Sequence, residues 1–510
     1  MRPPLRASHG VCCGRLRAKR YLERTFQNAY LKGHLMHEYV SPLASRNASP
    51  AMRSIWSPAR KFGLWRRLWL ALAQAERELG IDISQAQLDE LQANLDTVDL
   101  DAAAVYEKKL RHDVMAHVHA LGDQAPAARP IIHLGATSQF VVCNAELVML
   151  QEALALIAGK LASAIDRLGA FAAEHRDRPT LGFTHYQPAQ PTTVGKRATI
   201  WAQDLALALE DIEYRQSRLR FRGVKGTTGT QASFLALFNG DHAKVDRLDE
   251  LVTQAMGFDP EDRFAVTGQT YPRLMDAQVG AALAGAAAAA AKCATDIRLL
   301  ANRKEMEEPF EASQIGSSAM AYKRNPMRSE RICGLSRFVI GLVQTPFTTA
   351  AEQWFERTLD DSSCRRLTLP EPFLALDGVL DLLVNVTGGL VVYPETVKRN
   401  LAAELPFMAS ENLLMAAVKN GGDRQELHEV IREHSQAAAA RVKGEAADND
   451  LLDRLKSEPA FAGMDLEAVL DPAAFVGRAP EQVDAFIDRV VKPIRGRYAQ
   501  ALDDEVELRV

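Results

Sequence analysis

Apolar residues recur along most of this chain at steps of three and four positions, the spacing of one face of an α-helix. The segment 64–76 is typical, because Leu64, Leu68 and Leu72 alternate with residues that favour helices. Strand-like alternation is scarce. Each of four stretches is expected to form one long helix: 144–176, 196–221, 274–303 and 327–352. Such lengths exceed the usual mean of about 11 to 12 residues, so the pattern predicts an all-α fold with a long helical bundle that extends beyond one subunit.

Polar segments rich in Gly, Pro and Thr interrupt these helices at 180–191, 223–230 and 316–326. Loops that cap rigid helices often carry binding and catalytic side chains. A change in composition near Pro394 indicates the start of a C-terminal domain. The expected organisation is an N-terminal helical domain at 36–137, a central long-helix domain at 138–392 and a C-terminal helical domain at 393–510.

The composition of the 510 residues describes an ordinary soluble protein, with 47% hydrophobic residues, 25% charged residues and a net charge of -4. This balance disfavours nucleic acid as a partner. The six cysteines show neither disulfide-rich density nor paired CxxC spacing, so a reducing, cytoplasmic location is expected. No uninterrupted apolar run reaches the roughly 18 to 20 residues of a membrane span, so we do not expect the chain to cross a membrane.

The first 35 residues differ from the rest, because six basic residues precede the first acidic one, Glu23. No long apolar run follows them, which excludes a secretory signal. Three interpretations stay open: an organellar presequence, a disordered extension, or translation from an upstream start codon with Met36 as a second start. We leave residues 1–35 out of the fold prediction and expect them to be disordered.

The segment 316–326, here called the signature loop, combines a Gly, two hydroxyls, a Lys, an Arg and an Asn directly before a predicted helix. Such an arrangement can hold an anion at a helix N-terminus. A solvated Ser-rich linker without a binding role would have a similar composition. The sequence of this segment, Gly-Ser-Ser-Ala-Met-Ala-Tyr-Lys-Arg-Asn-Pro, resembles the signature loop of the fumarase/aspartase superfamily. Ala321 stands where that pattern has Pro, which alters the stiffness of the loop and keeps its polar members.

Within this superfamily the chain resembles the adenylosuccinate lyases of the animal type, from about Tyr39 to near its C-terminus. The resemblance implies a three-domain fumarase/aspartase-like fold that assembles into a homotetramer with active sites shared between subunits. It also implies release of fumarate from adenylosuccinate and from SAICAR, the succinylated aminoimidazole carboxamide ribotide, without a metal or other cofactor. The matching stretches are 41–46, 111–117, 133–138, the segment around His185, 225–231 and 354–362.

The resemblance implies that Ser317 is the base that takes a carbon-bound proton. A free hydroxyl is a weak base, so Ser317 must react as an alkoxide held by backbone N–H groups and cations, with Lys323 and the following helix start as candidates. His185 corresponds to the acid that protonates the leaving nitrogen, and an ordinary histidine pKa near 6.5 suits that task. Glu330 is its implied carboxylate partner.

The resemblance also implies a set of residues that bind the substrate. Isolated arginines must hold the nucleotide phosphate, because the chain has neither a Walker loop nor a dinucleotide-binding fingerprint. Asn47 replaces a Tyr of the family pattern, which could weaken nucleotide affinity, and Cys143 replaces an Asp. The implied substrate-binding residues are Arg46, Asn47, Arg111, His112, Asp113, Thr137, Ser138, Gln269, Lys323, Asn325, Glu330, Arg331, Arg357, Ser362 and Arg366.

Other interpretations were weighed against this one. His112, His117 and His119 lack the i, i+4 spacing of helical zinc sites, so no metal is expected. Argininosuccinate lyase and fumarase share the signature loop but lack the nucleotide-side arginines. A homologue that kept the fold and lost catalysis is a further alternative, which the departures at Asn47, Cys143 and Ala321 keep open and which an activity assay would decide.

Overall fold

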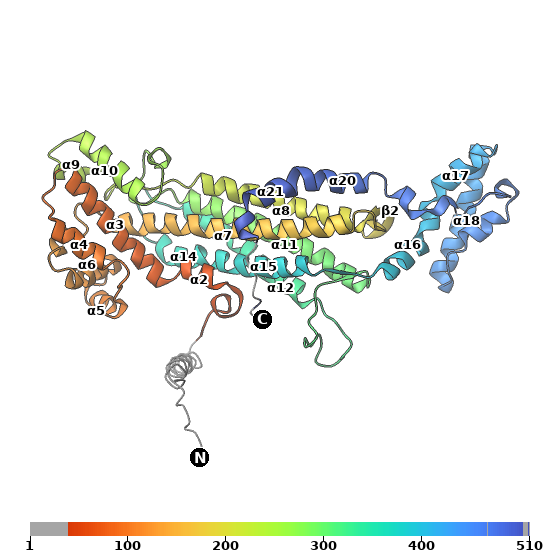
Figure 1. Ribbon diagram of the computed structural model, residues 1–510, viewed down its shortest axis with the longest axis horizontal. Helices are drawn as coiled ribbons and strands as arrows, with labels where there is room; N and C mark the ends of the chain where they lie inside the picture. The colour runs from red at the N-terminus through yellow and green to blue at the C-terminus, as the bar shows by residue number, and fades with distance from the viewer. Residues whose placement is uncertain (1–38, 467, 503–507, 509–510) are drawn as a thin grey trace, which may run out of the picture.

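A computed structural model describes residues 39–466, 468–502 and 508 of this chain. The expectations for residues 1–35 therefore lie outside the described residues. The molecule is elongated and predominantly helical, with a bundle of long helices along its middle (Figure 1). The predicted all-α fold is confirmed. The bundle consists of α7 (Ser138–Glu174), α8 (Val194–Ser217), α11 (Leu274–Asn302), α12 (Met327–Leu342) and α15 (Pro370–Gly388).

Helix α7 is the axis of this bundle and packs against α8 and α15 along much of its length. At about 1.5 Å rise per residue, its 37 residues span roughly 55 Å. The apolar seam formed by Leu147, Leu150, Leu154 and Ile157 is fully buried. Burial on this scale, more than intrinsic helix propensity, stabilises a helix in water.

One end of the bundle carries a group of shorter helices (Figure 1). Trp65 and Trp69 of α3 are fully buried there and join the main core. Two elements, η1 (Leu43–Asn47) and α2 (Pro50–Ile55), pack on the bundle itself, against α15 and α7. The elements of this end, and the two short helices that follow α12, are α3 (Pro58–Glu78), α4 (Gln85–Ala93), α5 (Leu100–Leu110), α6 (Asp113–Gln124), η2 (Arg129–Ile131), α9 (Ala232–Leu237), α10 (His242–Ala255), η3 (Pro260–Asp262), α13 (Gln344–Ala351) and α14 (Asp361–Thr368).

The opposite end has a small core of its own, which includes Leu413, Leu427 and Phe461. The chain then returns along α7 and α8, where Val483 and Val491 join the main core (Figure 1). The expected domain limits fall at the start of α7 and just before α16, and the division into three domains stays a prediction. The elements of this part are α16 (Pro394–Met408), α17 (Ser410–Lys419), α18 (Arg424–Glu445), α19 (Leu451–Lys456), η4 (Pro459–Phe461), η5 (Ala468–Leu470), η6 (Pro472–Phe475), α20 (Ala479–Phe486), η7 (Ile487–Val491), α21 (Lys492–Arg497) and η8 (Ala499–Ala501).

Two small antiparallel strand pairs interrupt the helices, and the first of them is a hairpin. The hairpin joins β1 (Pro179–Thr184) to β2 (Gln187–Thr193), and the other pair joins β3 (Met306–Glu307) to β4 (Val391–Val392). The segment 180–191 is therefore a hairpin and not the open loop that its composition suggested. Its two turn residues, His185 and Tyr186, have φ of 53° and 57°, the left-handed pair that two-residue hairpin turns require.

The predicted helix at 327–352 is wrong in its continuity. The structure breaks it at Val343 into α12 and α13. Pro346 explains the break, because a proline has no N–H to donate to the carbonyl four residues earlier and its ring clashes with that carbonyl. The other three predicted long helices are present and start within six residues of their expected positions.

The expectation about membranes also needs a correction. By length and composition alone, α7 and α11 are apolar enough to cross a membrane, and the bent pair of α16 and α17 adds a third candidate if it is one span. A search for uninterrupted apolar runs overlooked them. In the structure, 67% of the most apolar window of α7 and 50% of that of α11 are buried inside the molecule, so helix packing accounts for much of this apolar character.

Candidate active site

Nine of the expected substrate-binding residues line one cavity of about 510 Å³. It lies where the α5–α6 junction, the first turn of α7, the segment before α11 and the helix α14 meet. These segments are distant in sequence, and only packing brings them together. The nine are Arg111, His112, Asp113, Thr137, Ser138, Gln269, Arg357, Ser362 and Arg366.

The orientation of His112 is set by the start of α6. Its Nδ1 accepts a hydrogen bond from the backbone N–H of Met115 at 3.3 Å, so the side chain caps the helix. A neutral ring with an accepting Nδ1 carries its proton on Nε2. That atom lies 3.3 Å from Ser138 Oγ, at the first residue of α7. His112 thus presents an N–H group to the cavity, while Arg111 makes the turn between α5 and α6 with φ of 55°.

A buried charge network supports the arginines of the cavity wall. Asp361 accepts hydrogen bonds of 2.7 Å from both Arg273 and Arg357. Burial opposes ionisation of this carboxyl, yet the two guanidinium groups hold its pKa below the ordinary value. The ion pair with Asp361 therefore fixes the guanidinium of Arg357, which lines the cavity. Arg366 is held differently, by a 3.2 Å ion pair with Asp113.

Arg365, one residue earlier on α14, anchors the same helix. Its guanidinium contacts Asp276 and Glu146, both at 2.7 Å, and the Tyr271 hydroxyl at 2.6 Å. The Tyr271 hydroxyl in turn donates to Asp276 at 2.6 Å. Such charge-assisted bonds in a buried setting are strong, so α14 presents Ser362 and Arg366 from a rigid base.

The signature loop is tied at its ends. Asn325 Nδ2 donates to the carbonyl of Gly316 at 2.8 Å. A Cβ on Gly316 would lie 2.2 Å from the carbonyl oxygen of Lys323, so only glycine allows this close approach. Inside the loop, Ser317 Oγ accepts hydrogen bonds from the backbone N–H groups of Ala319 at 3.3 Å and Met320 at 3.1 Å. These two donors favour negative charge on that oxygen.

The helix start after the loop does not serve Ser317 in the way suggested above. Glu308 accepts hydrogen bonds from the first backbone N–H groups of α12, those of Arg328 at 2.9 Å and Ser329 at 2.8 Å. A carboxylate at this position satisfies the amides and offsets the positive end of the helix dipole. Lys323 is exposed on the loop.

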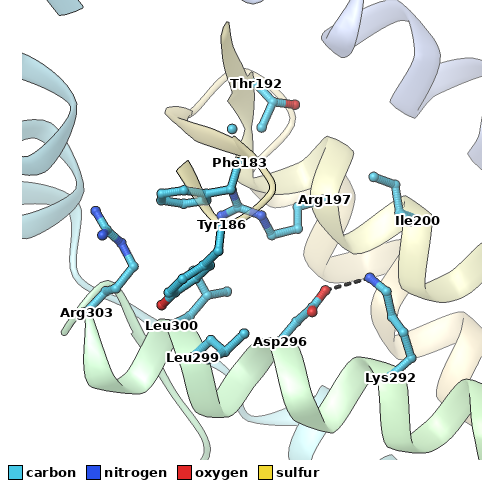
Figure 2. A pocket seen from close by; sticks show the side chains of 11 residues that line it. Phe183, Tyr186, Thr192, Arg197, Ile200, Lys292, Asp296, Leu299, Leu300 and Arg303 are labelled. Carbon is cyan, nitrogen blue, oxygen red and sulfur yellow. Dashed lines mark hydrogen bonds and ion pairs between the residues drawn. The ribbon is translucent and has the colours of Figure 1, made fainter. Parts of the chain in front are cut away.

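His185 lies at the exposed tip of the β1–β2 hairpin. A second cavity of about 440 Å³ lies between this hairpin and the helices α8 and α11, where Tyr186 reaches toward Leu299 and Leu300 of α11 (Figure 2). Phe183 is flanked there by the guanidinium groups of Arg197 and Arg303, 6.0 and 4.7 Å from its ring centroid. These contacts hold the hairpin against α8 and α11 and leave His185 free to face outward.

The remaining expected residues lie outside the first cavity. Asn47 caps its own short helix η1 by donating to the carbonyl of Pro42 at 2.9 Å, and its backbone packs against Gly378 of α15. Arg331 on α12 is close enough to Arg46 for the two charges to interact. Burial, then the charge of Arg46, lowers the pKa of Arg331. Within the described part of the chain, Glu330 and His185 share no hydrogen bond or ion pair.

The cavity residues at the start of α7 and the hairpin that carries His185 are separate within one chain. Ser138 begins α7, whereas the hairpin that carries His185 begins only five residues after α7 ends. Their separation is roughly the 55 Å length of that helix. A nucleotide-sized molecule cannot contact both ends.

Comparisons with known proteins identify the family of this chain. A family model described as "Lyase" matches residues 46–341 and one described as "Adenylosuccinate lyase C-terminus" matches residues 406–486. An adenylosuccinate lyase of Schizosaccharomyces pombe is 52% identical over 92% of this chain and 99% of its own length. One from Saccharomyces cerevisiae is 51% identical with the same coverage. The chain belongs to the adenylosuccinate lyase family.

Solved structures support the fold of this adenylosuccinate lyase family member. A 3-carboxy-cis,cis-muconate lactonizing enzyme from Pseudomonas putida aligns with a TM-score of 0.76 at 26% identity, over 89% of this chain and 99% of that one. A fumarate lyase from Mesorhizobium aligns with a TM-score of 0.74 at 23% identity, over 89% and 100%. The family membership decides against argininosuccinate lyase and fumarase, which were the other enzymatic interpretations.

The three departures from the adenylosuccinate lyase pattern have different surroundings. Cys143 is fully buried on α7, 4.0 Å from Arg273, whose Nη2 has no hydrogen-bond partner among the described residues. Ala321 is exposed on the signature loop, and Asn47 is half-buried.

Several residues that line the cavity were missed by the motif comparison. Val142 and Glu146 follow Ser138 at steps of four, so they share its face of α7, and this helical spacing could have revealed them. Nothing in the local sequence marks Lys61, which reaches the cavity from α3. The missed lining residues are Lys61, Glu107, Val114, Gln139, Val142, Glu146, Leu359 and Arg365.

The two histidines left without a role are packed away from the cavity lining. His117 is buried and stacks on Phe62 with ring centroids 3.8 Å apart. His119 stacks on Tyr106 at 5.2 Å. Each ring therefore packs against a different aromatic side chain, and neither histidine lines the cavity.

Proposed function

We propose that this chain is an adenylosuccinate lyase that eliminates fumarate from adenylosuccinate to give AMP, and from SAICAR to give AICAR. The family membership carries this proposal, because relatives half identical over nearly their whole length bear that name. The convergence of nine expected substrate-binding residues on one cavity supports it. The cavity volume of about 510 Å³ lies within the usual range of about 300 to 1,000 Å³ for small-molecule sites.

The elimination needs a base, a cradle for negative charge and an acid. Ser317 would take the proton from the carbon beside a succinyl carboxylate, and the released electron pair would form the double bond of fumarate as the carbon–nitrogen bond breaks. His185 would return a proton to the departing purine nitrogen. The backbone N–H groups that face Ser317 Oγ support the first assignment, because they stabilise an alkoxide at that atom.

The cavity would hold the substrate between its cations and hydroxyls. Arg357 and Arg366 suit the phosphate, since guanidinium groups match phosphate oxygens. Thr137 and Ser138, with Lys323 and Asn325 of another subunit, would hold the succinyl carboxylates. His112 would donate a hydrogen bond from its Nε2–H to the substrate.

A homotetramer with shared active sites is part of the same proposal. The separation of about 55 Å between the ends of α7 supports it, because His112 and His185 of one chain cannot meet on one substrate. A stripe of exposed apolar side chains supports it further. Ile200, Leu207 and Tyr214 follow each other at intervals of seven on α8 and are 45%, 54% and 48% exposed, which is typical of a surface that another helix covers.

The decisive experiment is an assay of the purified chain with adenylosuccinate and with SAICAR. Chromatography should identify fumarate together with AMP or AICAR, and light scattering should give the mass of four chains. Argininosuccinate and malate serve as substrates that should not react. A folded tetramer with no turnover of either succinylated substrate would instead support the homologue that lost catalysis.

A further inference from the structure

Lys61 is one of two cavity-lining cations that no motif singled out, and the other, Arg365, is already held by buried partners. Lys61 lies in the first turn of α3, and its ammonium is 5.3 Å from the Phe62 ring centroid and 5.2 Å from that of Trp65. Among the residues that the structure describes, the Lys61 side chain makes no hydrogen bond or ion pair, and its backbone N–H donates to the carbonyl of Ser57. Arg357 and Arg366, in contrast, are each paired with a carboxylate. The N–H donors of the Lys61 ammonium are therefore available to a molecule in the cavity.

The aromatic rings below Lys61 give it a defined position. Phe62 stacks on His117 with centroids 3.8 Å apart, and Trp65 meets the same histidine edge-on at 5.4 Å. Burial, followed by the charge of Arg66, lowers the pKa of His117 to about 4, so this ring is neutral near pH 7 and does not repel the ammonium. Cation–π contacts of this kind hold a lysine without consuming its hydrogen-bond donors.

The charges around Lys61 are mixed. Burial lowers its pKa, and the charge of Arg366 adds to that effect, while Glu146, Asp113 and Glu107 oppose it. The ammonium is therefore under-compensated, which is the state that an added anion relieves. Arg366, whose charge reaches Lys61, is one of the residues expected to contact the nucleotide. An anion held by Arg366 would thus interact with Lys61 as well.

We propose that Lys61 is a substrate-binding residue that contacts the phosphate of the nucleotide beside Arg366. The inference rests on the proposed function and adds one member to its phosphate site. Lysine binds phosphate as a point charge, without the planar fork of an arginine. Its contribution should therefore appear in affinity for phosphate-bearing ligands and should survive replacement by another cation.

The test compares product inhibition in four forms of the full-length chain: wild type, Lys61→Met, Lys61→Arg and Lys398→Met. Methionine keeps the aliphatic stem on the rings and removes the charge. Lys398 is an exposed lysine on α16, far from the cavity in the sequence and in the fold, and is the matched control. For each form, inhibition constants are measured for AMP, adenosine and fumarate, together with kcat and KM.

In Lys61→Met, the inhibition constant of AMP should rise about 10- to 100-fold, as expected when one hydrogen bond to a charged group is lost. The constants for adenosine and fumarate should stay within about threefold, and so should kcat. Lys61→Arg should bind AMP within about threefold of wild type. Lys398→Met should match wild type throughout.

An unchanged AMP constant in Lys61→Met would overturn the proposal, and so would equal losses for AMP and adenosine. Weaker inhibition by fumarate alone would assign Lys61 to a succinyl carboxylate instead. If Lys61→Met does not fold, as judged by its helical circular dichroism, Lys61→Gln replaces it under the same criteria. A wild-type chain without turnover would contradict the proposed function, whereas an active wild type with insensitive Lys61 variants would contradict only this inference.

Discussion

The carboxamide of Asn325 donates a 2.8 Å hydrogen bond to the carbonyl oxygen of Gly316, which joins the two ends of the signature loop. Between them lies Ser317, whose Oγ receives two backbone N–H groups of the same loop. The position of the proposed base therefore depends on a contact between residues nine positions apart.

Asn325→Ala should lower kcat at least tenfold, because a loop that is no longer tied presents Ser317 in the reactive geometry only part of the time. The thermal midpoint should change little, since removal of one partly exposed hydrogen bond costs about 1 kcal/mol. Steady-state kinetics and a melting curve check both statements. Unchanged kcat would show that other contacts are sufficient to hold the loop.

Ser317→Ala and His185→Ala should each lower fumarate release by about two to four orders of magnitude, the usual cost of losing a general acid or base. Both residues lie outside the helical core, so each variant should remain folded as the proposed tetramer and should still bind AMP. Activity above about a tenth of wild type in either variant would make the corresponding assignment wrong.

Mixing these two inactive variants tests the shared site directly. If each site takes Ser317 and His185 from different subunits, random reassembly of tetramers should restore about a quarter of wild-type activity, since half of the chains carry each intact residue. The mixture is unfolded and refolded together, and each variant refolded alone is the control. A mixture as inactive as its parents, or a fully active monomer, would contradict sharing between subunits.

Asn47→Tyr should restore a contact on the nucleotide side. The Asn47 amide already donates to Pro42 within its own turn, whereas a tyrosine ring and hydroxyl extend further. We expect KM to fall about fivefold, which corresponds to the roughly 1 kcal/mol of one neutral hydrogen bond. The value of kcat should stay nearly constant. Unchanged KM would mean that this position does not touch the nucleotide, and a collapse of kcat would place it among the reacting groups.

Glu76 should make the stability of the N-terminal helices depend on pH. Burial raises the pKa of this carboxyl to about 8, and neither of its oxygens has a hydrogen-bond partner among the described residues. Because the folded chain keeps the proton up to about pH 8 while the unfolded chain releases it near the ordinary value of 4.5, the free energy of unfolding should fall as pH rises between these values.

Replacing Glu76 with glutamine should remove most of this dependence. The effect is at most on the order of 5 kcal/mol, since one pKa unit corresponds to about 1.4 kcal/mol. Denaturant titrations of Glu76→Gln and wild type near pH 5 and pH 8 measure it. Glu78→Gln, an exposed change on the same helix, is the control. Parallel losses of stability in wild type and Glu76→Gln would show that Glu76 is not the group responsible.

The sequence by itself was sufficient for the helical class, because apolar spacing at three and four positions is a local property that packing then confirms. Leu64, Leu68 and Leu72 are buried as their spacing predicted. The motifs were likewise sufficient for the family, and nine of the residues that they indicated meet in one cavity. Short motifs carry this information because each places several polar side chains on one turn or loop.

Only the tertiary structure decided which of these residues can act together, since contacts between distant segments depend on packing and not on local pattern. The roughly 55 Å length of α7 separates Ser138 from the hairpin of His185, so the single chain holds parts of a site. Pairing across β1 and β2 made a hairpin from a segment with the composition of a loop. Glu308 reached the start of α12 from twenty residues away, and the packing of α3 brought Lys61 to a cavity whose other walls lie at least 46 positions further along the chain.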